Sequence, residues 1–139
     1  MKKLIVTLLF VLTVSLNAQI VIKLDSFYFF KYKSEYNVYD ALNNNLHEKR
    51  GSGVAGVTLK FDTISMVGTQ ENLYDNSVET FPIIRTIHVS NDVVTYVVSN
   101  EVGDFFSYTY FQNTPSQKQV ICLWKKSAHE MYGWQSVAK

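Results

Sequence analysis

Short apolar runs recur along the chain from about residue 20, and clusters of Gly, Asn, Asp and Ser separate them. No helical period of apolar positions persists over a long window, whereas runs of this length, rich in β-branched and aromatic residues, are typical of antiparallel strands. The pattern predicts a single all-β domain, an antiparallel meander of eight or nine strands that forms a barrel-like or two-layer sandwich domain. The expected strands cover residues 20–24, 27–33, 54–61, 64–67, 82–89, 93–99, 105–112, 119–125 and 131–137.

The second half of the chain has the clearest turns. The Ser-Asn-Asp sequence at 90–92 accepts turn conformations, so residues 82–99 are predicted to form a hairpin. Residues 100–104 are expected to join the next two strands, and the proline-containing segment 113–116 is expected to join the following pair. These turns together predict a four-strand meander over residues 82–125.

Residues 40–53, DALNNNLHEKRGSG, are polar and end in Gly-Ser-Gly. They predict a mobile loop at about 40–53, with one helical turn around residues 42–46. Long loops on β scaffolds often carry function, and a solvated connector is the alternative.

The last residues, 127–139, allow two interpretations. The S-x-x-E spacing at 127–130 matches a capping box that opens a helix. However, Gly133 would interrupt that helix, and Tyr132 and Trp134 share a face at strand spacing. We therefore expect a turn followed by a last strand.

The chain begins with two lysines, an apolar run over residues 4–16 and a polar step that ends at Ala18. This layout is typical of a secretory signal peptide, and the apolar run is shorter than the roughly 20 residues that a membrane-spanning helix needs. We expect residues 1–18 to be a signal peptide and residues 19–139 to be the mature domain. The protein would then be exported, periplasmic or extracellular, with no stable membrane anchor after cleavage.

Charge and cysteine content narrow the function classes. Without the two leader lysines the 13 basic residues fall to 11, against 12 acidic residues, which leaves a net charge of −1. A near-neutral chain without basic clusters has no electrostatic footprint for nucleic acid. Cys122 is the only cysteine, so no disulfide can form within the chain, and its apolar neighbours indicate a small buried side chain.

Motifs for metal binding and catalysis are missing. The three histidines do not lie at spacings that would place two imidazoles on one side of an element, so no metal site is expected. The sequence has no GxSxG, HExxH or Walker A motif. We therefore expect no catalytic residues and no cofactor.

Aromatic strands are the remaining candidate for function. In 27–33, FYFFKYK, the tyrosines share one face while the lysines share the other with two phenylalanines, and in 105–111 the rings also divide between two faces. Rings on both faces favour a barrel or a sandwich over an open sheet with one wet side. Such rows can hold a ligand by stacking, or they can pack as cross-strand pairs inside the core. The candidate ligand-binding residues are Tyr28, Tyr32, Phe106, Tyr108, Tyr110, Trp134, Lys31 and Lys33.

Several segments give the chain a recognisable layout: LNAQ at the end of the leader, FYFFKYK, VTLKFD with ISMVG, FPIIRTIHVSNDVVTYVV, the aromatic strand after a Gly-Asp turn, and YGW near the end. This layout resembles that of small exported proteins of unknown function from Bacteroidota such as flavobacteria. The resemblance implies export and no established site residues. A weaker likeness of layout relates the chain to lipocalin-like barrels, although the G-x-W signature of lipocalins is absent near the first strand.

The expected function is that of an exported, non-enzymatic binding or interaction module that holds an apolar or stacking ligand against its aromatic strands. The expected partner is an unknown small apolar ligand or a protein, and not a nucleic acid. The alternative is a structural or protein-interaction component without a small-molecule pocket. A hydrolase with carboxylates that converge from turns is the less favoured third alternative.

Overall fold

The computed structural model of the protein describes residues 19–112 and 120–136. The predicted signal peptide at 1–18 and the predicted turn at 113–116 lie outside the described residues.

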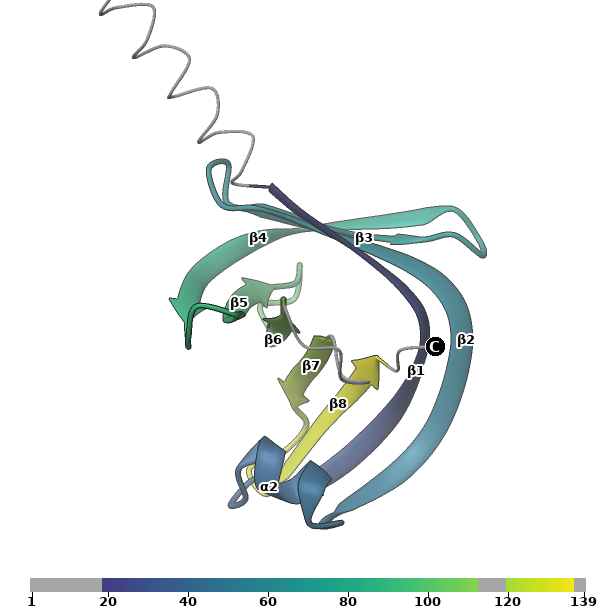
Figure 1. Ribbon diagram of the computed structural model, residues 1–139, viewed down its shortest axis with the longest axis vertical. Coiled ribbons are helices and arrows are strands. Elements are labelled where there is room, and N and C mark those ends of the chain that lie inside the picture. Colours follow the sequence, from purple (N-terminus) through teal and green to yellow (C-terminus); the bar gives the residue numbers. More distant parts are fainter. Residues whose placement is uncertain (1–18, 113–119, 137–139) are drawn as a thin grey trace, which may run out of the picture.

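Eight antiparallel strands form a closed barrel in which each strand pairs with the next and the last pairs with the first (Figure 1). The all-β prediction is confirmed, and of its two architectures the barrel is the correct one. The predicted four-strand meander in the second half is also present. The strands are β1 (Gln19–Lys33), β2 (His47–Asp62), β3 (Val67–Asn72), β4 (Ser77–His88), β5 (Val93–Ser99), β6 (Phe105–Phe111), β7 (Val120–Lys125) and β8 (Glu130–Ser136).

Strand β1 is continuous where two strands were expected. Its pairing with β2 shifts register between Leu24 and Ser26, so Asp25 lies at a bulge. Because a bulge inserts a residue without ending the strand, the inward face passes from Leu24 to Phe27. The polar Asp-Ser pair therefore bends the strand and does not end it.

The prediction of a loop at 40–53 was wrong in its secondary structure. Helix α2 (Val38–Asn43) begins after Asn37, whose side chain accepts a hydrogen bond from the backbone N–H of Tyr39, and β2 already starts at His47. The polar composition indicated a loop because this half of β2 is largely exposed. Backbone pairing with β1 nevertheless holds it extended. A Cβ at Gly53 would lie 2.9 Å from Cε2 of Phe27, so glycine makes room for that ring.

The predicted strand at 64–67 was also wrong, because residues 63–66 form a turn. The Asp62 carboxylate accepts hydrogen bonds from the backbone N–H groups of Ile64 and Ser65, and Met66 adopts a φ of 56°. A side chain that bonds the backbone two residues ahead favours a turn over a strand. Consequently β3 lies later in the chain than expected, and β4 begins at Ser77, five residues before the predicted start.

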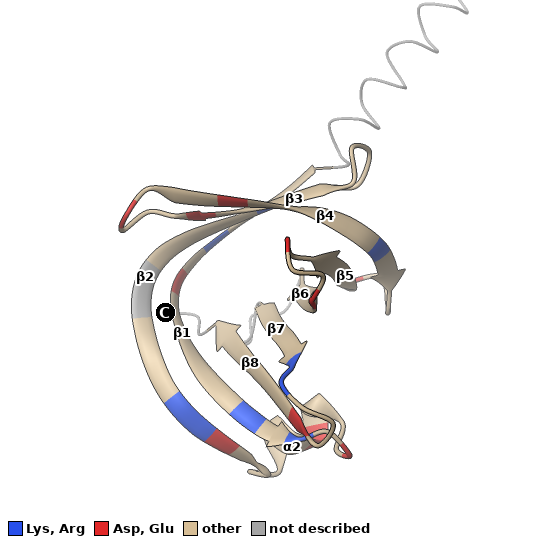
Figure 2. Ribbon diagram, turned by 180° about the vertical axis from the view of Figure 1, so that it is seen from behind, with Lys and Arg blue, Asp and Glu red and all other residues tan. Residues whose placement is uncertain are grey.

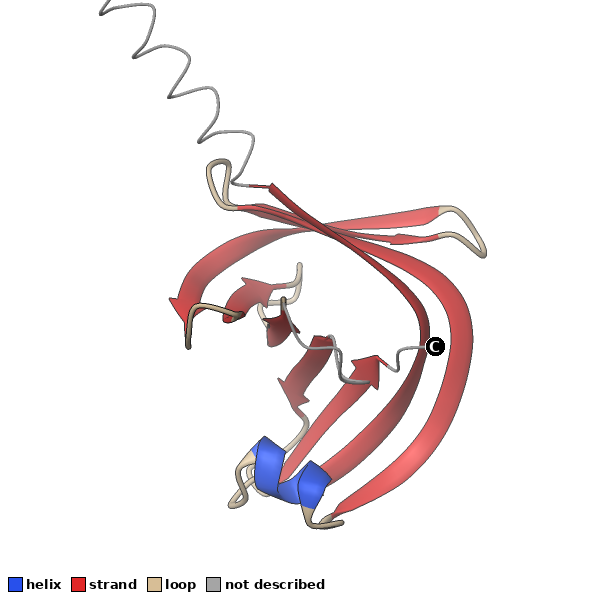
Figure 3. Ribbon diagram, in the orientation of Figure 1, coloured by secondary structure: helices blue, strands red, loops and turns tan. Residues whose placement is uncertain are grey.

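The apolar side chains form two clusters, one inside the barrel and one outside it. Inside, the ring of Phe61 stacks on Tyr96 with centroids 4.3 Å apart. Outside, α2 places Ala41 and Leu42 against Phe30 at one end of β1 (Figure 3). The aromatic strands have rings on both faces because both faces are covered. Each fully buried side chain of this size contributes about 1.5–3 kcal/mol of hydrophobic stabilisation.

Within the described part of the chain, no helix is long and apolar enough to span a membrane.

Gly133 lies on β8, which pairs with β7 on one side and with β1 on the other, and we call this place the seam of the barrel. The close packing there makes Gly133 a test of the seam. A Cβ at Gly133 would lie 2.5 Å from the carbonyl oxygen of Cys122 and 2.9 Å from Cζ of Phe30. We expect Gly133→Ala to lower the free energy of unfolding by about 1–3 kcal/mol, since the neighbours must move to admit the methyl group. Chemical denaturation measures this change. Gly51→Ala is the control, because nothing lies within 4 Å of a Cβ there, and equal losses in the two variants would contradict the packing of the seam.

Candidate functional site

The barrel interior holds a cavity of about 360 Å³, which is within the range of about 300–1,000 Å³ that ligand pockets occupy. Its lining comes from both halves of the chain, so it exists only because the barrel closes. Smaller side chains such as Leu24, Val57 and Cys122 complete the lining.

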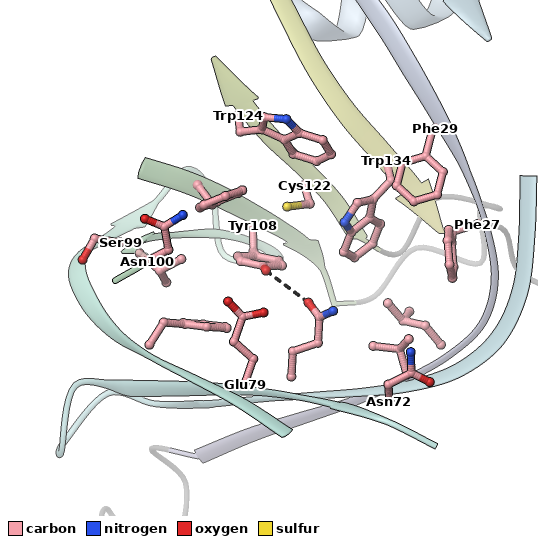
Figure 4. A pocket seen from close by; sticks show the side chains of 16 residues that line it. Phe27, Phe29, Asn72, Glu79, Ser99, Asn100, Tyr108, Cys122, Trp124 and Trp134 are labelled. Atoms are coloured by element: carbon pink, nitrogen blue, oxygen red, sulfur yellow. Dashed lines mark hydrogen bonds between the residues drawn. The ribbon is translucent and has the colours of Figure 1, made fainter. Parts of the chain in front are cut away.

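One wall of the cavity is aromatic. Phe27 meets Phe29 edge to face at 5.4 Å and meets Trp134 at 6.0 Å between ring centroids. Figure 4 shows these side chains together with Trp124 on one side of the cavity. Such rings offer a ligand both flat faces and edges. The rings of this wall, which we call the aromatic wall, are Phe27, Phe29, Phe106, Tyr108, Trp124 and Trp134.

Polar side chains gather where β3, β4 and the end of β5 line the cavity. Gln70 and Glu79 are directly paired residues of β3 and β4, so their side chains project to the same side of the sheet. Asn72 lies two residues beyond Gln70 on the same face, and Asn100 follows the end of β5. In Figure 4 the carboxylate of Glu79 points toward Tyr108. We call these four residues the polar wall.

Tyr108 connects the two walls. Its hydroxyl donates a hydrogen bond to Oε1 of Gln70 at 3.2 Å, and its ring stacks on Phe81 at 5.7 Å. Burial raises the pKa of Tyr108 well above its usual range, and the neighbouring Cys122 and Glu79 raise it further. Burial likewise raises the pKa of the Cys122 thiol. Both groups are therefore neutral near pH 7, and Cys122 is not an activated nucleophile.

Three of the predicted site residues line the cavity, namely Phe106, Tyr108 and Trp134. Tyr110 faces the same interior but packs against the cluster inside the barrel and does not line the cavity. The inward-facing rings of β6 therefore divide: Phe106 and Tyr108 line the cavity, and Tyr110 packs in the core.

The other predicted residues lie elsewhere. Tyr28 and Tyr32 belong to the outer cluster, where the Tyr28 hydroxyl donates to Oε1 of Gln135. Lys31 and Lys33 line a separate groove with His47, and the Lys31 ammonium lies 3.4 Å from a carboxylate oxygen of Glu48. Parity along 27–33 correctly separated the tyrosines from the lysines, but it could not tell which face is inside.

Sequence reasoning missed the rest of the site. Phe27 and Phe29 share the lysine face, and Trp124 shares a face with Cys122; both pairings were visible as strand parity. The polar wall left no local signal, because Gln70 and Glu79 meet only through the β3–β4 register.

Among residues 19–112 and 120–136 no three His, Cys, Asp or Glu side chains gather as metal ligands would. Glu79 is the one carboxylate among the described residues that line the cavity. Glycoside hydrolysis usually requires a pair of carboxylates flanking the bond. The described lining of the cavity therefore supplies one carboxylate where this reaction uses two.

No protein-family model, curated protein or solved structure matches the chain.

Burial of Tyr108 has a measurable consequence at alkaline pH. In the unfolded chain Tyr108 ionises near pH 10.0, whereas in the folded protein it stays neutral above that pH. The free energy of unfolding should therefore fall as pH rises above 10, by up to about 1.4 kcal/mol per pH unit for this group. We expect a shallower fall for Tyr108→Phe in denaturation curves recorded across this range. Tyr74→Phe, at a side chain that is 88% exposed, should keep the original slope, and equal slopes in all three proteins would refute the burial of Tyr108.

Proposed function

We propose that the protein is an exported, non-enzymatic binding module that holds a small amphipathic ligand in the barrel cavity. The observation that carries the proposal is the division of the cavity into an aromatic wall and a polar wall. A ligand with an apolar face and polar substituents satisfies both walls at once. The pattern of residues 1–18, two lysines followed by an apolar run, is typical of a signal peptide and supports export.

The second candidate function is protein interaction through the β3–β4 hairpin. The hairpin exposes Leu73, Tyr74 and Val78, whose exposed fractions are 53%, 88% and 61%. Exposed apolar side chains at a hairpin tip favour contact with a partner. This candidate requires no cavity, so a binding assay on the cavity separates the two.

The two tryptophans make that assay direct. The sequence has only two, Trp124 and Trp134, and both line the cavity. A molecule that enters must therefore change the intrinsic tryptophan fluorescence. The uncharged dye N-phenyl-1-naphthylamine is a suitable probe, because its own emission increases in apolar surroundings.

We expect the dye to bind the wild-type protein with quenching of tryptophan emission. Val57→Phe should weaken binding about tenfold or more, since its larger side chain occupies cavity space and even 1.4 kcal/mol changes affinity tenfold. Val97→Phe is the matched control, because Val97 is half-buried and lies outside the cavity lining on β5. Absence of dye binding, or equal weakening in both variants, would count against a ligand cavity.

A further inference from the structure

The two asparagines of the polar wall have fixed amide orientations. The side-chain oxygen of Asn100 accepts hydrogen bonds from the backbone N–H groups of Val102 and Asp104, at 3.1 and 2.9 Å. The oxygen of Asn72 accepts from the backbone N–H of Tyr74 at 2.9 Å. Because a backbone N–H can only donate, the amide nitrogens must be the remaining ends. Figure 4 shows the Asn100 nitrogen on the side of Tyr108.

Gln70 and Glu79 complete the set of polar groups. The oxygen of Gln70 accepts from the Tyr108 hydroxyl, which leaves its amide nitrogen as a further donor. In the described part of the chain the Glu79 carboxylate has no ion-pair partner, and it is the only charged group of the cavity lining. The polar wall thus offers a ligand three amide donors and one strong acceptor.

This pattern of donors and one acceptor disfavours anions, purely apolar molecules and organic cations as ligands. An anion in the cavity would meet the carboxylate of Glu79, which lies on β4 of the β3–β4 hairpin, where Figure 2 colours the acidic residues red. A purely apolar ligand would leave the amide donors that it covers without hydrogen-bond partners.

An organic cation fits less well than the rings first suggest. Glu79 and the ring faces would attract it. The three amides, however, present N–H groups to the same space, and these groups cannot accept a hydrogen bond from an ammonium. Arg50 also lies 4.6 Å from the ring centroid of Tyr132, in a neighbouring pocket that shares Phe29 and Trp124 with the cavity.

A sugar satisfies both walls. Each hydroxyl can accept from an amide and donate to the carboxylate, while the C–H faces of the sugar ring pack on Trp124 or Trp134. We propose that the cavity binds a neutral mono- or disaccharide, with its hydroxyls on Gln70, Glu79 and Asn100 and its C–H faces on the aromatic wall. This proposal rests on the proposed function, because it names the ligand class of the same cavity.

The negative charge of Glu79 predicts that the cavity distinguishes neutral sugars from acidic ones. A uronic acid differs from the neutral hexose by a carboxylate, which Glu79 would repel. We expect glucose or galactose, and disaccharides built from them, to bind more tightly than glucuronic or galacturonic acid. Glu79→Gln should reduce that discrimination, because it removes the repulsion, and should weaken binding of the neutral sugar about tenfold, because it removes the charged acceptor.

The experiment is a fluorescence titration of the full domain, residues 19–139, with a panel of ligands. The panel contains neutral hexoses and pentoses, their disaccharides, the two uronic acids and tetramethylammonium, each tested alone and in competition with N-phenyl-1-naphthylamine. Glu71→Gln is the matched control, because Glu71 lies on the opposite face of β3 between Gln70 and Asn72. We expect at least one neutral sugar to displace the dye from the wild-type protein and from Glu71→Gln at similar concentrations.

The outcomes separate the two proposals. Dye binding without displacement by any neutral sugar overturns the carbohydrate proposal and leaves the cavity proposal standing. Displacement by tetramethylammonium alone overturns it in favour of a cation. If neither the dye nor any sugar binds, both proposals fail. Sugar binding that is equally weakened by Glu79→Gln and Glu71→Gln would overturn the role of Glu79 in the cavity.

Discussion

Strand β1 pairs along its second half with β2 on one edge and with β8 on the other, and this double pairing closes the barrel. The bulge at Asp25 determines which side chains of that half face inward. Ile22 and Leu24 face the interior before the bulge, and Phe27 faces it afterwards. If β1 ran without the bulge, Tyr28 and Phe30 would take the inward positions, and the outer cluster beneath α2 would lose its rings.

Closure also explains why one part of the interior is filled and another part is open. Phe61 stacks on Tyr96 and meets Phe81 at a tilt, with ring centroids 6.4 Å apart, and Tyr108 joins this packed layer by stacking on Phe81. Gly68 permits this layer, since a Cβ there would collide with the Phe81 ring. Beyond Tyr108 the interior is lined by the aromatic wall, the polar wall and smaller side chains such as Leu24 and Val57, which leave the cavity between them. The packed layer stabilises the fold, and the open part is available for binding.

The sequence predicted those strands along which apolar residues that become buried alternate with less buried ones. In β5, Val94, Tyr96 and Val98 are buried and alternate with half-buried neighbours, so the predicted bounds of that strand are the observed ones. The start of β2 carried no such signal, because its residues are largely exposed and backbone pairing with β1 holds them. The polar wall depends on register between strands, which a local pattern does not contain. Half of the aromatic wall was predicted because parity identifies the faces of β6 and β8, whereas the inward face of β1 depends on a bulge.

The proposed function requires that ligands enter the space between the aromatic and polar walls and not the outer cluster beneath α2. Nuclear Overhauser spectroscopy of the protein with bound N-phenyl-1-naphthylamine tests it most directly, because each contact joins a dye proton to an assigned ring. We expect contacts from the dye to the indoles of Trp124 and Trp134 and to the ring of Tyr108. Contacts to Tyr28 and Tyr32 in place of these would contradict it.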